Sequence, residues 1–296
     1  MDRCLARDQG LIQKIMATPG AAFLHRHPRL RLAGVLGAPL VWLGVVYLGS
    51  LAALLVTSLW VQDPFTTEIF RTWTFDNFRQ LVTEPLYRDV LVRTIAIAAS
   101  VTVIDLALAL PIAFFMAKIA RPRAARFLVI ACLMPLWASY LVKAYAWRLL
   151  VLDHGVLDST FGITPGLGLV AVVLTLSYLW LPYMILPIYA GLERLPDSLL
   201  EASEDLGARP GRTFWSVVWP SLIPSMIAGS IFTFSLSLGD YITVDVVGGA
   251  SQMLGNLVDD NQSLNLPFAA AIATFSVVVM AIYLALVRRT GALEKL

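Results

Sequence analysis

Long apolar runs separated by short polar segments dominate the pattern of this chain. Six such runs cover residues 34–60, 90–117, 127–151, 166–191, 216–239 and 267–287. Each has about 20 residues or more, which is enough for an α-helix to cross a hydrocarbon layer of about 30 Å. The alternation typical of membrane β-strands is absent, and a backbone in lipid must satisfy its hydrogen bonds internally. The pattern therefore predicts an all-α integral membrane protein with six transmembrane helices.

The positively charged residues indicate how these helices are oriented. Four alternate segments, both termini included, carry sixteen lysines and arginines, whereas the three intervening segments carry three. The sixteen are Arg3, Arg7, Lys14, Arg26, Arg29, Arg31, Lys118, Arg121, Arg123, Arg126, Arg194, Arg209, Arg212, Arg288, Arg289 and Lys295, and the three are Arg71, Arg79 and Arg88. Since lysine and arginine are enriched in cytoplasmic segments, we expect both termini in the cytoplasm.

The runs also divide the chain into parts. We expect a basic cytoplasmic tail over residues 1–33, and a first transmembrane helix with an extracytoplasmic loop over 34–89. A core follows over 90–287, and a cytoplasmic tail over 288–296. The first run is too long for the apolar region of a signal peptide and lacks a small-residue cleavage site, so we expect it to remain in the mature protein.

Composition narrows the function. The chain is 58% hydrophobic and 14% charged, against about 25% charged residues in soluble proteins. Its net charge of +2 gives no electrostatic support for binding nucleic acid. Cys4 lies in the tail, Cys132 lies in an apolar run, and the three histidines are scattered. We therefore expect neither a disulfide nor a metal site.

One polar stretch, between the fourth and fifth runs, holds five acidic residues and three arginines. Ser198 and Glu201 have the spacing of a capping box at a helix N-terminus, and Gly207 suits a helix C-cap. Arg209-Pro210-Gly211 predicts a turn. We therefore expect a short cytoplasmic helix over about residues 198–207. An ordinary solvated loop helix is the plain alternative.

The spacing within this stretch carries a family resemblance. Glu201-Ala202-Ser203 is followed after three residues by Gly207 and after nine more by Val217-Val218-Trp219-Pro220. This resembles the cytoplasmic signature of type I ABC importer permeases: Glu-Ala-Ala, three residues, Gly, nine residues, Ile-x-Leu-Pro. Ser203 replaces the second Ala, and Val217 and Trp219 are looser substitutions. The resemblance implies the type I importer transmembrane fold, with Glu201, Ala202 and Gly207 in a coupling helix that docks on an ATPase.

The resemblance also implies an assembly in the bacterial inner membrane. Its other members are an ATPase dimer that uses ATP and Mg, a second permease subunit and an extracytoplasmic substrate-binding protein, all within or beside membrane lipid. This chain has no Gly-x-x-x-x-Gly-Lys-Ser/Thr loop, so we expect it to bind no nucleotide or other cofactor and to catalyse no reaction itself.

Four further segments look like those of spermidine/putrescine permeases, and more specifically like the first of the two permeases in such systems. They are PLWASYLVKAYAW (Pro135–Trp147), LPYMILPIYAGLERLP (Leu181–Pro196), LGDYITVDVVGG (Leu238–Gly249) and LPFAAAIA (Leu266–Ala273). Lys143 stands where such permeases more often have Arg, which keeps the charge but changes the geometry of any contact. The resemblance implies polyamine import by alternating access.

Other functions stay open at this point. Iron, thiosulfate or an amino-acid derivative are alternative substrates within the ABC class. A channel or a secondary transporter would need no ATPase, and the chain shows no inverted repeat of the kind found in many secondary transporters.

Four residues are candidates for the substrate path. Asp105 lies in the second run, where a buried charge is expensive; it either meets a cation or fixes helix packing. Asp240 closes the fifth run beside Tyr241, and it is either a carboxylate at the mouth of the path or a polar helix end. Trp137 is a weaker candidate, because an interfacial aromatic belt explains it as well.

The distribution of acidic residues bears on the substrate. Eleven acidic residues fall on the expected extracytoplasmic side, against the three arginines there. They are Asp63, Glu68, Asp76, Glu84, Asp89, Asp153, Asp158, Asp240, Asp245, Asp259 and Asp260. Such a face concentrates cations over about one Debye length, about 8 Å at physiological salt. The sequence thus favours a linear polycation such as putrescine or spermidine.

Overall fold

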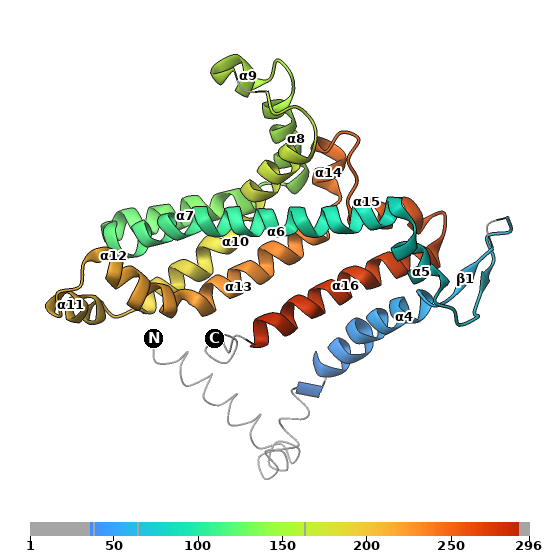
Figure 1. The fold of residues 1–296 in the computed structure, drawn as a ribbon, viewed down its shortest axis with the longest axis horizontal. Coiled ribbons are helices and arrows are strands. Elements are labelled where there is room, and N and C mark those ends of the chain that lie inside the picture. Colours follow the sequence, from blue (N-terminus) through green and yellow to red (C-terminus); the bar gives the residue numbers. More distant parts are fainter. Residues whose placement is uncertain (1–35, 38, 64, 163, 290–296) are drawn as a thin grey trace, which may run out of the picture. The chain divides into compact units, whose positions relative to one another are not determined.

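The computed structural model describes residues 36–37, 39–63, 65–162 and 164–289 (Figure 1). The predicted tail over 1–33 and residues 290–296 of the predicted C-terminal tail lie outside the described residues. The chain divides into two compact units, Met1–Val56 and Thr57–Leu296.

In the first unit, the described residues form the helical run Pro39–Thr57, whose last residue already belongs to the second unit. The run consists mainly of η1 (Leu43–Leu48), a π-helical segment, and α4 (Gly49–Thr57). No side chain of η1 or α4 is buried. The run has 19 residues and is long and apolar enough to cross a membrane, where the sequence predicted the first transmembrane helix.

The second unit begins with the loop that follows α4. Strands β1 (Val61–Gln62) and β2 (Ile69–Phe70) pair antiparallel, and α5 (Asp76–Thr83) follows them. The Asn77 side-chain amide donates hydrogen bonds of 2.9 Å to the carbonyls of Ser58 and Trp60. This loop carried no sequence motif that predicted its structure.

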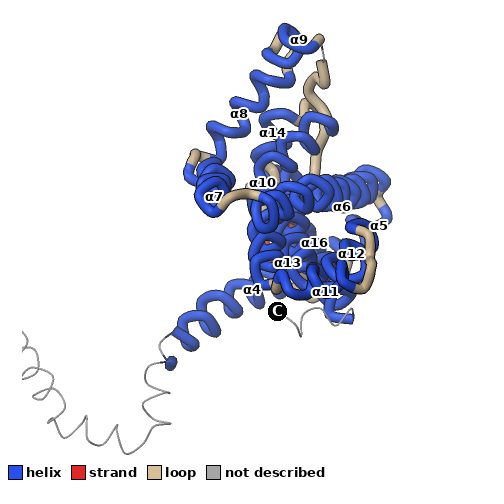
Figure 2. Tube along the Cα trace, turned by 90° about the vertical axis from the view of Figure 1, so that its left-hand side faces the viewer, coloured by secondary structure: helices blue, strands red, loops and turns tan. Residues whose placement is uncertain are grey.

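Three long helices, α6 (Pro85–Phe114), α10 (Leu169–Arg194) and α13 (Trp219–Leu238), pack against one another and form the core (Figures 1 and 2). Small residues allow the close approach, as is usual between membrane helices. A Cβ added at Gly229 of α13 would lie 2.7 Å from the Met184 sulfur of α10, and one at Gly191 would lie 2.3 Å from the Ser225 hydroxyl oxygen.

These helices extend into the runs that the sequence predicted. α6 continues through η2 (Phe115–Ile119) to form a run of 35 residues, and α12 (Pro210–Thr213) and η3 (Phe214–Val218) lead into α13. α16 (Leu266–Arg289) is the last helix of the described chain. Within the described residues, five helices are long and apolar enough to cross a membrane, and the number is six if one bent pair of helices is taken as a single span.

The bent pair corrects the predicted third span, which we expected to be one helix over residues 127–151. α7 (Pro122–Trp137) and α8 (Tyr140–Val151) meet at an angle of 96°, so α8 points away from α7 in Figure 1. Ala138 has extended backbone angles and Pro135 lies in the last turn of α7. A proline inside a helix removes one backbone hydrogen bond and favours a break.

The short helices α14 (Ile242–Val247) and α15 (Leu254–Gln262) connect α13 to α16. α15 packs in a buried cluster with α5, α6 and α16, and the Leu254 amide donates to the Thr94 hydroxyl of α6 at 3.0 Å. α9 (Val156–Phe161) follows α8. The Arg148 guanidinium of α8 donates to the Val246 carbonyl of α14 at 2.6 Å, so this cation of the third span has a structural partner.

Candidate functional site

The predicted coupling helix is α11 (Asp197–Asp205), at the opposite end of the helical core from α5 and α15 (Figure 1). Its expected capping box is absent: the N-cap is Pro196, and no side-chain cap hydrogen bond forms there. Because Asp197 is the first helical residue, Ser198 lies two positions past the N-cap and cannot take its role. The helix itself and its position in the sequence agree with the prediction.

The C-terminal end of α11 follows the predicted glycine chemistry. Gly207 has φ +77°, a left-handed conformation that favours glycine. Its amide donates to the Glu204 carbonyl at 2.8 Å, and the Ala208 amide donates to the Ser203 carbonyl at 3.0 Å. Glu201, Ala202 and Gly207 are all exposed, which leaves them accessible to another protein.

Two side-chain contacts hold α11 against the core. Lys118 of η2, which continues α6, donates to the Leu195 carbonyl at 2.8 Å and forms an ion pair of 2.6 Å with Asp197. The hydroxyls of Ser203 and Thr213 are 2.9 Å apart, so the residue that departs from the family signature links α11 to α12. α11 is therefore tied both to η2 and to the run that leads into α13.

At the other end of the core, Asp240 follows α13 and is 8% exposed. Its carboxylate accepts hydrogen bonds from the Tyr140 hydroxyl and, at 2.8 Å, from the Thr243 amide. Burial raises the pKa of Asp240, and the hydrogen bonds from Tyr140 and Thr243 oppose that rise. The contact with Tyr140 joins α8 to the start of α14.

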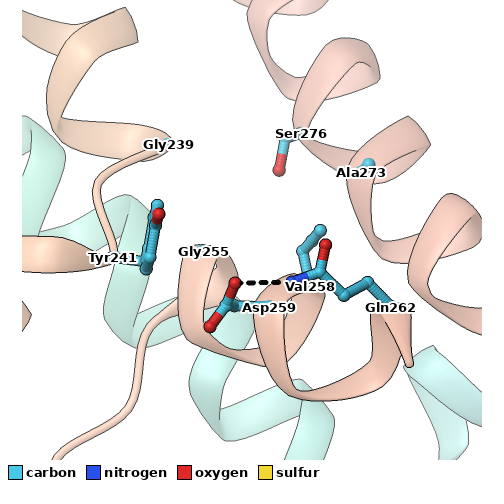
Figure 3. Close-up of a pocket in the computed structure, with 8 residues that line it drawn as sticks. All are labelled: Gly239, Tyr241, Gly255, Val258, Asp259, Gln262, Ala273 and Ser276. Atoms are coloured by element: carbon cyan, nitrogen blue, oxygen red, sulfur yellow. Dashed lines mark hydrogen bonds between the residues drawn. The ribbon is translucent and has the colours of Figure 1, made fainter. Parts of the chain in front are cut away.

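Two cavities adjoin this turn. One, of about 230 Å³, includes Tyr140, Trp180, Asp240 and Tyr241 in its lining, and the Tyr140 and Trp180 rings stack with centroids 5.9 Å apart. The other has a volume of about 370 Å³ and lies between the end of α13, α15 and α16. Figure 3 shows Tyr241 on one side of it and Asp259, Gln262 and Ser276 around the rest. Tyr241 borders both cavities.

The structure brings Asp240 and Tyr241 together but leaves the other two candidates apart. Asp105 is 0% exposed and lines neither cavity, and its carboxyl oxygens have no hydrogen bond of good geometry to any described residue. The Ser177 side chain of α10 lies near the Asp105 carboxyl group. Trp137, at the end of α7, is 93% exposed. A role for Asp105 or Trp137 in the substrate path stays a prediction.

Sequence reasoning singled out neither Gln262 nor Ser276 as a candidate, and it treated Asp259 only as part of an acidic face. The four-residue step from Val258 to Gln262 places residues on one side of a helix. However, nothing in the sequence predicted that α15 packs against α16. The hydrogen bond between Tyr140 and Asp240 joins residues 100 positions apart. A contact at this separation could not be predicted from the single sequence.

Comparison with known proteins defines the class first. Residues 92–292 match the family described as binding-protein-dependent transport system inner membrane component. The chain therefore belongs to this family, and it is a permease subunit of an ABC importer and a multi-pass membrane protein.

Individual relatives follow from the same comparison. The chain is 42% identical over 300 residues to the inner membrane ABC transporter permease protein YdcU of Escherichia coli (strain K12), covering 93% of this chain and 95% of that protein. It is 32% identical over 237 residues to the spermidine/putrescine transport system permease protein PotB of the same organism, covering 75% and 84%.

Solved structures show the same fold. A chain of the bacterial ABC transporter that imports the acidic polysaccharide alginate superposes with a TM-score of 0.66 at 12% identity, covering 90% of this chain and 98% of that one. A chain of the inward-facing MetNI methionine ABC transporter gives a TM-score of 0.54 at 17% identity, covering 70% and 97%. The type I importer transmembrane fold predicted from the sequence is confirmed.

Proposed function

We propose that this permease forms the transmembrane path for a polyamine of the putrescine or spermidine kind. The observation that carries the proposal is the charge at the outer end of the core. Asp240, Asp245, Asp259 and Asp260 lie there, and none of them forms an ion pair with a lysine or arginine of the described chain. Residues 238–287 contain neither lysine nor arginine. Such uncompensated carboxylates favour a cationic solute.

The similarity to PotB supports the same substrate class, since that protein is named for spermidine and putrescine transport. YdcU carries no substrate in its name, and a relative from Mycobacterium bovis that is 28% identical is named for molybdenum transport. The acidic outer end argues against an oxyanion, because it would repel one.

The coupling proposal concerns the inner end. α11 would dock on an ATPase dimer that uses ATP and Mg, with Glu201 and Ala202 on its exposed surface. Leu199 is 47% and Leu206 89% exposed, and exposed apolar side chains of this kind suit a protein contact. Both termini would lie in the cytoplasm, and a second permease subunit and an extracytoplasmic binding protein would complete the importer.

Uptake of labelled substrates tests the proposal. Cells that lack their own polyamine importers would express the chain with its partner subunits and be offered putrescine, spermidine, molybdate, thiosulfate and several amino acids. We expect accumulation of a polyamine that is lost when the chain is deleted. Accumulation of an oxyanion without any polyamine would overturn the substrate assignment and leave the permease assignment intact.

A further inference from the structure

The cavity between α13, α15 and α16 exists because small residues stand at its walls. Gly239, Gly255 and Ala273 all line it. A Cβ at Gly255 would lie 2.9 Å from both the Asp240 carbonyl oxygen and the Tyr241 Cβ. α15 can therefore lie this close to the Asp240–Tyr241 turn only with glycine at this position. Larger side chains at these three positions would fill the hollow or push its walls apart.

Polar groups converge on the same hollow from three segments. Asp259 and Gln262 come from α15, Ser276 comes from α16, and the Tyr241 ring closes one side (Figure 3). The Gln262 amide nitrogen donates to Asp259 at 2.7 Å. The Gln262 carbonyl oxygen and the Ser276 hydroxyl oxygen are further acceptors. The wall thus offers one carboxylate, two neutral acceptors and one aromatic face.

Charge around the cavity is negative. Burial raises the pKa of Asp245, and the charges of Asp259 and Asp260 add to that rise, against the hydrogen bond that its carboxylate accepts. The negative charges of Asp259 and Asp260 therefore repel that of Asp245. No lysine or arginine of the described chain forms an ion pair with them. A cation entering the cavity would relieve this repulsion.

We propose that this cavity is a binding site for one ammonium group of a linear polyamine, with Asp259 as its counter-ion. The inference rests on the proposed function and names a site for that substrate. An ammonium group donates three hydrogen bonds, which match Asp259, Gln262 and Ser276 in number. The methylene chain next to it would lie against the Tyr241 ring, and an ammonium near that ring gains from its negative face.

Asp240 in the neighbouring cavity is less available for this task. Its carboxylate already accepts hydrogen bonds from Tyr140 and Thr243 and is 8% exposed. Asp259 is more accessible, and within the described part of the chain its one side-chain donor is Gln262. We therefore expect the substrate to contact Asp259 before Asp240. Tyr241 borders the cavities of both residues.

Transport by two kinds of variant tests the site. Asp259→Asn removes the charge, and Ala273→Leu fills the hollow without changing charge. Asp260→Asn is the matched control, because Asp260 is the adjacent carboxylate, is exposed, accepts from Gln252 at 3.2 Å and does not line the cavity. With equal amounts of each variant in the membrane, we expect roughly tenfold lower polyamine uptake for the first two, the size of one lost charged hydrogen bond. The control removes a charge that lies outside the cavity wall, so its uptake should fall by much less than that of the first two variants.

A labelling experiment reports on the cavity without transport. Ser276→Cys, in a chain whose Cys4 and Cys132 are replaced by serine, would be treated in membranes with thiol reagents that carry either an ammonium or a sulfonate group. We expect faster reaction with the ammonium reagent, slowing on addition of putrescine, and loss of the charge preference when Asp259→Asn is added.

The outcomes separate the two proposals. If the importer carries polyamines but Asp259→Asn and Ala273→Leu transport at the parental rate, and putrescine does not slow labelling, the site is wrong and the function stands. If no polyamine is imported while Ser276→Cys still prefers the ammonium reagent and loses that preference with Asp259→Asn, the cavity binds cations and the polyamine function fails.

Discussion

Replacing Gly207 tests how α11, the proposed coupling helix, ends. Gly207 has φ +77°, and a Cβ added there would meet nothing within 4 Å. The cost of a side chain is therefore a backbone cost alone, about 1–2 kcal/mol for an ordinary residue in the left-handed region and more for a β-branched one. Because 1–2 kcal/mol corresponds to a factor of about 5 to 30, Gly207→Val should make the native end of α11 less populated by at least that factor.

The assay is co-purification of the ATPase with the permease from detergent-solubilised membranes, together with substrate uptake. Gly211→Val is the matched control: Gly211 lies in α12, is exposed, lacks a positive φ, and its Cβ would also meet nothing within 4 Å. We expect Gly207→Val to accumulate in the membrane but to lose most of its ATPase and its transport, while Gly211→Val behaves as the parent. Full ATPase recovery and uptake by Gly207→Val would refute this account of the coupling helix.

Two further predictions concern the same end of the core. Lys118→Met should lower the substrate moved per ATP hydrolysed, because the tie to Leu195 and Asp197 is worth about 1–2 kcal/mol; Asp197→Asn should do less, since its side chain is 75% exposed. Lys118→Arg should restore most of the coupling ratio, and equal ratios in all variants would show that the tie is passive. A reporter fused after Arg209 should read as cytoplasmic and one near Asp259 as extracytoplasmic, and the reverse pattern would overturn the orientation and the docking surface together.

Most of the fold could be predicted from the sequence, because the lipid bilayer itself sets the hydropathy and the length of each transmembrane span. The runs around α6, α10, α13 and α16 needed no tertiary information, and neither did the left-handed end of α11, because glycine at residue 207 is the residue type that such an end requires. The third span could not be predicted in full. Its sequence is apolar on both sides of the break, so the 96° bend has only Pro135 as a local signal.

Less of the candidate site could be predicted from the sequence. Asp240 and Tyr241 could be found because they interrupt the end of an apolar run, but the carboxylate's partner Tyr140 lies on another helix. Asp259 stood out only as one charge among several, since its position in a cavity depends on the packing of α15 against α16. Contacts of this kind depend on how the helices pack, which the hydropathy pattern along the sequence does not predict.

Transport by the purified importer tests the central claim most directly. The chain would be reconstituted into proteoliposomes with its second permease subunit and ATPase, with the binding protein and labelled putrescine or spermidine on the outside and ATP inside. The account predicts polyamine accumulation against a gradient that requires ATP, Mg and the binding protein together, with no accumulation of molybdate. Polyamine uptake that persists without ATP, as in a channel or a secondary transporter, or ATP-driven uptake of an anion alone, would contradict it.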